Sequence, residues 1–166
     1  RERLNLIVGG YRNNKASILE RRHELLELNV GWQLDASVIR ALVDIGVGFR
    51  DALTSSIKYF NDGLKDKKTK KVIHKGVGLE LDKHCGTNFY RHSDGLMQAA
   101  LANANFDDAE QFAKDIQALR GQLKSLCLQL FEQETRPYLN DPQLIHTLAV
   151  ARCTLYRHLK QLMQME

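Results

Sequence analysis

Three histidines and a cysteine lie within one stretch of the sequence, and their side chains are the kinds of ligand that Zn²⁺ selects. These candidates are His74, His84, Cys85 and His92. Their spacing matches no common zinc module, because the adjacent His84 and Cys85 would rarely both reach one ion, and no paired CxxC or HxxxH element is present. Exposed or packed side chains explain these residues better than a metal site, so the sequence predicts no cofactor.

Lysines gather in the same part of the chain. Between residues 58 and 75 there are seven lysines against Asp62 and Asp66, a local charge of +5 in a chain whose net charge is +4. A focused positive patch attracts phosphates or acidic surfaces even when the rest of the protein is nearly neutral. We expect DNA or another polyanion to contact Lys67, Lys68, Lys70 and Lys71. The alternative is a solvated loop without a ligand.

The C-terminal segment from Leu144 to Leu159 contains a second group of candidates. In order along the chain, they are Val150, Arg152, Thr154, Leu155, Tyr156 and Arg157. This run resembles the helix-turn-helix of resolvases and invertases, in which an apolar helix and a turn precede a recognition helix. The resemblance implies that Arg152, Thr154, Tyr156 and Arg157 face the groove or the backbone of DNA.

Two residues of this segment depart from the helix-turn-helix pattern. Ala149 stands where the turn usually has glycine, and His146 stands where the first helix usually packs a small alanine. The same segment also fits one uninterrupted amphipathic helix, whose apolar positions would be Leu144, Leu148, Ala151, Leu155 and Leu162. The backbone at Ala149, turn or helix, distinguishes the two interpretations.

Enzyme signatures are absent from the sequence. There is no GxSxG elbow, no HExxH pair and no phosphate-binding glycine loop. A non-enzymatic function is therefore favoured over catalysis.

Helical periodicity dominates the rest of the chain, which has the length and composition of one globular domain. Helices are expected over residues 13–29, 35–60, 93–103, 107–134 and 141–165, the last as one helix or as a helix-turn-helix. Residues 62–94 are expected to be an irregular basic excursion, with a weak hairpin signal between residues 72–73 and 77–81. The predicted fold is an all-α bundle of four or five helices with this long connection.

Cysteine usage and hydropathy bear on the cellular setting. The three cysteines are odd in number and far apart, which is typical of a reducing, cytoplasmic protein, and no run of about 20 apolar residues predicts a membrane span. The leading prediction is a non-enzymatic nucleic-acid-binding or DNA-associated regulatory protein. The alternative is a helical interaction or adaptor module that binds a partner helix, a second copy of itself or an acidic protein surface.

Overall fold

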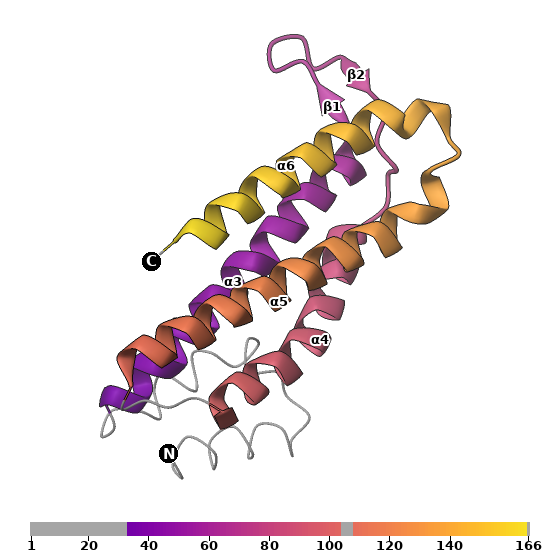
Figure 1. Cartoon of the computed structure of the whole chain (residues 1–166). Coiled ribbons are helices and arrows are strands. Elements are labelled where there is room, and N and C mark those ends of the chain that lie inside the picture. The colour runs from indigo at the N-terminus through magenta and orange to yellow at the C-terminus, as the bar shows by residue number, and fades with distance from the viewer. Residues whose placement is uncertain (1–32, 104–107, 166) are drawn as a thin grey trace.

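The structure is a computed structural model that describes residues 33–103 and 108–165. Four helices make up most of this part of the chain, which confirms the predicted all-α bundle (Figure 1). They are α3 (Gln33–Asp62), α4 (Leu81–Asn103), α5 (Ala109–Thr135) and α6 (Ile145–Gln164). The helix expected over residues 13–29 lies outside the described residues.

Helix α3 packs against all three other helices, as α5 also does. Its buried side chains recur every three or four residues, so they form one stripe along the helix. This stripe includes Phe49, Leu53, Ile57 and Phe60. Gly48 lies where α6 crosses, because a Cβ added there would come within 3.1 Å of Leu162 Cδ2. A residue without a Cβ at this position thus lets the two helices approach closely.

Helix α4 begins earlier than the sequence predicts, so the expected bounds of the irregular stretch and of this helix are both wrong. The irregular stretch ends before Leu81 rather than at residue 94, and the helix expected from residue 93 begins at Leu81 instead. Its core-facing row repeats every four residues and consists of Cys85, Phe89, Ser93 and Met97, all fully buried. A cysteine and a serine in that row, with Gly86 and Gly95 between, hide the apolar period from a sequence reading.

A small antiparallel hairpin projects from the end of the bundle between α3 and α4 (Figure 1). Strand β1 (Leu64–Lys65) pairs with β2 (Val72–His74), with Leu64 opposite His74 and Lys65 opposite Val72. The predicted pairing of residues 72–73 with 77–81 is therefore wrong. The chain turns at residues 66–71, while Val77 and Gly78 instead donate backbone hydrogen bonds to the end of α3, at Phe60 and Asn61.

Local capping signals define the boundaries of α5 and the connection to α6. The Asp108 side chain accepts a hydrogen bond from Gln111 N and caps α5, and the helix gives way to the 3₁₀ turn η1 (Arg136–Tyr138), which contains Pro137. Asp141 then caps η2 (Pro142–Leu144), which leads directly into α6. None of the helices in the described ranges is long and apolar enough to cross a membrane.

Candidate nucleic-acid interface

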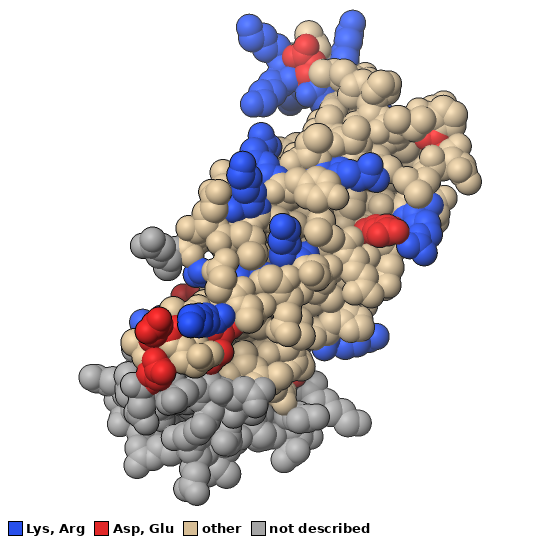
Figure 2. All heavy atoms as spheres, in the orientation of Figure 1, with Lys and Arg blue, Asp and Glu red and all other residues tan. Residues whose placement is uncertain are grey.

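The hairpin tip carries four of the predicted phosphate-binding residues. We call residues 66–71 the lysine loop. It contains Lys67, Lys68, Lys70 and Lys71, which are all exposed. Figure 2 shows basic side chains gathered around acidic atoms at the end of the molecule where the hairpin projects in Figure 1.

Backbone hydrogen bonds close the lysine loop. Asp66 N donates to Lys71 O and Lys70 N donates to Asp66 O, each at 2.9 Å. Lys70 has a φ of 57°, in the left-handed region that reverses the chain direction in tight turns. Inside the turn, Asp66 Oδ1 accepts from Lys68 N at 2.8 Å and from Thr69 N at 3.3 Å. These donors, Lys68 first, hold the pKa of the Asp66 carboxyl below its ordinary value of 3.8.

Contacts at the base of the hairpin fix it to the start of α6. Thr147 Oγ1 donates to Lys75 O at 2.6 Å, and Lys75 Nζ donates to Gln143 Oε1 at 3.2 Å. The rings of His74 and His146 stack with their centroids 4.9 Å apart. The lysine loop is thus held at one end of a helix that lies about seventy residues further along the chain.

Two glycines allow the base of the hairpin to close. A Cβ on Gly76 would lie 2.3 Å from Gly63 N and 2.4 Å from Asn61 O, which are backbone atoms that cannot give way easily. Gly63 itself has a φ of +75°. Only residues without a Cβ fit this backbone-to-backbone contact.

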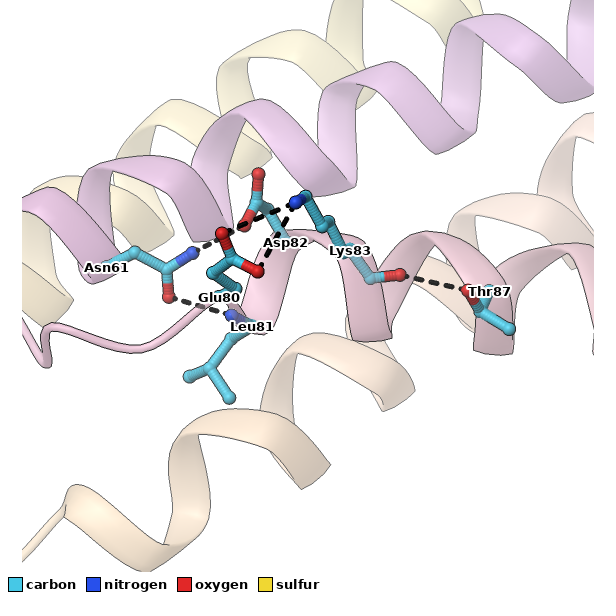
Figure 3. A network of polar contacts seen from close by, with 6 residues as sticks. All are labelled: Asn61, Glu80, Leu81, Asp82, Lys83 and Thr87. Carbon is cyan, nitrogen blue, oxygen red and sulfur yellow. Dashed lines mark hydrogen bonds and ion pairs between the residues drawn. The ribbon is translucent and has the colours of Figure 1, made fainter.

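Asn61 joins the end of α3 to the start of α4 on the other side of this base (Figure 3). Its side-chain Nδ2 donates to Asp82 Oδ1 at 2.9 Å, and its Oδ1 accepts from Leu81 N at 3.3 Å. The side chain is buried, so both of its polar ends need partners. Next to it, Lys83 pairs with Glu80 at 3.3 Å on the exposed surface. The excursion between the two helices is therefore held at both of its ends.

Helix α6 contains no aspartate or glutamate, and its outer face carries cations. Arg152, Arg157 and Lys160 are exposed, as is Tyr156 at 52%. Figure 2 shows basic side chains over the face where α6 lies in Figure 1, as well as at the hairpin. The sequence interpretation did not include Lys160, although its spacing of four residues from Tyr156 and eight from Arg152 places the three on one side of a helix.

Residues 149–151 form no turn, because α6 is continuous from Ile145 to Gln164. The segment therefore has the uninterrupted amphipathic helix rather than the two helices of the resolvase-like motif. Thr154 consequently lies opposite Arg152 and Tyr156, since two residues correspond to about 200° of helical rotation. It is buried and its Oγ1 donates to Val150 O at 2.9 Å, so it packs in the bundle instead of facing a ligand.

The four candidate metal ligands have other contacts in the structure. His74 stacks on His146, and His84 Nε2 lies 3.3 Å from Glu134 Oε1 on α5. Cys85 is buried, and burial, with Glu134 and Asp82 nearby, raises the pKa of its thiol. His92 lines a shallow hollow between α4 and α5. Within residues 33–103 and 108–165, no three His, Cys, Asp or Glu side chains are placed to hold a metal ion.

The fold and surface define an α-helical bundle protein with a projecting basic hairpin and a cationic outer helix. Residues 1–130 match the family of CRISPR-associated protein Cse1. The match covers well over half of the chain, and the protein belongs to this family. The matched range includes the lysine loop, whereas α6 lies beyond its end.

Proposed function

We propose that this protein is a non-enzymatic nucleic-acid-binding component of a CRISPR-associated complex. One observation carries the proposal. The hydrogen bond from Thr147 to Lys75 and the stacking of His74 on His146 place an exposed lysine loop at the beginning of a helix without acidic residues. The family to which the chain belongs supports a role beside nucleic acid.

Phosphate contacts are the proposed mode of binding. Each lysine that neutralises a phosphate releases condensed counterions, which contributes affinity without reading sequence. Along α6, with a rise of about 1.5 Å per residue, Arg152 follows Thr147 by roughly 8 Å and Lys160 follows it by roughly 20 Å. The exposed cations of α6, which are Arg152, Arg157 and Lys160, form what we call the cationic row. This row would continue the path of a nucleic-acid backbone away from the lysine loop, with Arg152 and Arg157 contacting the backbone or base edges.

A salt titration with a charge-matched control tests the proposal. The Lys67→Ala/Lys68→Ala variant should bind a labelled duplex more weakly than wild type, with a shallower dependence of log K on log salt by about 1.8 if each lysine holds one phosphate. The control is Arg91→Ala/Lys114→Ala, which removes two exposed cations from α4 and α5. Equal loss in both double variants, or no salt-sensitive binding by wild type, would contradict the proposal.

A protein contact at the hairpin is the second candidate function. Val72 and Ile73 are each 60% exposed beside the lysines, and exposed β-branched residues of this kind are a feature of protein-binding surfaces. The Val72→Ser/Ile73→Ser variant should then lose association with co-expressed CRISPR-associated proteins while keeping its affinity for nucleic acid. If association is retained, Val72 and Ile73 are not needed for protein binding, and the hairpin is left with nucleic-acid binding as its proposed role.

The cellular setting follows from the cysteines. All three are free, with Cys85 and Cys127 buried and Cys153 exposed. Free thiols persist in reducing compartments, and we infer the cytoplasm as the location of the protein.

A further inference from the structure

The lysine loop begins with an acidic residue. Asp66 is the single carboxylate among four lysines between residues 66 and 71. By charge alone, it weakens the attraction of the loop for any polyanion, since it lowers the net positive charge of the loop. A carboxylate in this basic loop is explained if it has a structural role.

The hydrogen bonds of Asp66 indicate such a role. Both its main chain and its side chain bond to the loop, through Lys70 N and Lys71 O on one hand and through Lys68 N and Thr69 N on the other. A side chain that accepts from the amide two residues ahead forms a turn without help from neighbouring elements. The Asp66 side chain thus bonds to the backbone at Lys68 and Thr69, and the Thr69 hydroxyl accepts in turn from Lys71 N at 3.5 Å.

We propose that Asp66 is a positioning residue that holds the lysine loop in one conformation for binding a phosphodiester backbone. This inference rests on the proposed function. A loop that is already ordered loses less conformational entropy when it binds, so its lysines bind phosphate more tightly than the same lysines on a mobile chain. The benefit of this order exceeds the electrostatic penalty of one carboxylate that stays in the turn.

Two variants with the same charge separate order from electrostatics. Asp66→Asn and Asp66→Ala both remove the negative charge, but asparagine keeps a side-chain oxygen that can accept from Lys68 N and Thr69 N. Asp66→Asn should bind a labelled oligonucleotide at least as tightly as wild type. Asp66→Ala should bind it at least about fivefold more weakly than Asp66→Asn, because it loses the turn. If electrostatics alone governed binding, the two variants would be equally tight.

Amide hydrogen exchange gives a readout that is independent of binding. In Asp66→Ala the amides of Lys68 and Thr69 should exchange markedly faster than in wild type, while Asp66→Asn should retain most of their protection. The melting temperature should be nearly the same in all three proteins, because the loop lies outside the hydrophobic core. Unequal melting of the two variants would mean that Asp66 supports the bundle rather than the loop, which overturns the inference.

The binding results distinguish failure of the proposed function from failure of the role of Asp66. If wild type shows no salt-sensitive binding, the proposed function and this inference both fail. If wild type binds through Lys67 and Lys68, but Asp66→Asn and Asp66→Ala have equal affinity, above or below that of wild type, only the role of Asp66 is overturned.

Discussion

Gly76 is the residue whose replacement should disturb the hairpin most directly. A Cβ there would overlap Gly63 N and Asn61 O, so the Gly76→Ala variant must shift the backbone at the hairpin base. We expect it to lower the free energy of unfolding by about 1–3 kcal/mol, as overpacked sites do, measured by urea denaturation.

Gly121→Ala is the control, because a Cβ at Gly121 meets nothing within 4 Å. Helix propensity should make this control stabilising by up to about 1 kcal/mol. Wild-type stability of Gly76→Ala would contradict the close contact.

The three cysteines should differ sharply in reactivity. Burial raises the pKa of the Cys85 and Cys127 thiols, and both are inaccessible, whereas Cys153 lies exposed on α6. Since the thiolate is the reactive form, we expect one thiol to react rapidly with an aromatic disulfide reagent in the folded protein and all three in denaturant. The Cys153→Ser variant should remove the fast phase. Any fast-reacting thiol that remains in this variant would be Cys85 or Cys127, and would show that the core around α4 or α5 opens readily.

At the scale of elements, the orientation of the hairpin depends on its anchor to α6. The Thr147→Val variant removes the hydroxyl that donates to Lys75 O but keeps the shape of this buried side chain. We expect a loss of about 1 kcal/mol in unfolding free energy and faster amide exchange across residues 64–75. Thr154→Val is the matched control, because its hydroxyl bonds within α6 to Val150 O. Equal exchange in the hairpin of both variants would show that Thr147 does not hold it.

The contribution of the cationic row of α6 to nucleic-acid binding can be tested separately from that of the hairpin. The Arg152→Ala/Lys160→Ala variant should weaken nucleic-acid binding and reduce the salt dependence, as loss of phosphate contacts requires. If Arg152 reads a base, Arg152→Ala should additionally cost about 1–3 kcal/mol on the preferred site and less on random duplex. Gln161→Ala, an exposed uncharged neighbour, should bind as wild type does. A full salt dependence in the double variant would confine binding to the hairpin.

In the whole molecule, α3 packs against each of the other helices, as α5 also does, so its core stripe is shared by the entire bundle. The Leu53→Ala variant, at a fully buried position in its core stripe, should lose about 2–5 kcal/mol of unfolding free energy. The loss should appear as one cooperative transition, since the four helices share one hydrophobic core. Val150→Ala, on the exposed face of α6, should stay within about 0.5 kcal/mol of wild type. A separate early transition in Leu53→Ala would indicate that part of the bundle folds on its own.

Local sequence patterns were enough to predict features that depend on residues a few positions apart. The periodicity that predicts helices over residues 35–60 and 107–134 involves neighbours within one or two helical turns, and α3 and α5 lie there, with the cap of α5 at Asp108. The lysine loop is likewise visible as a run of charge, and Arg152, Tyr156 and Arg157 are exposed where the C-terminal pattern placed them.

Other features depend on contacts between residues far apart in the sequence. Helix α4 buries Cys85 and Ser93, although neither is a strong apolar signal in the sequence. The continuous α6 turned Thr154 inwards, and the bond from Thr147 to Lys75 joined two cationic regions separated by 72 positions. Such pairings depend on which surfaces bury one another and satisfy one another's polar groups. The pattern of residues a few positions apart in the sequence does not show which surfaces will pair.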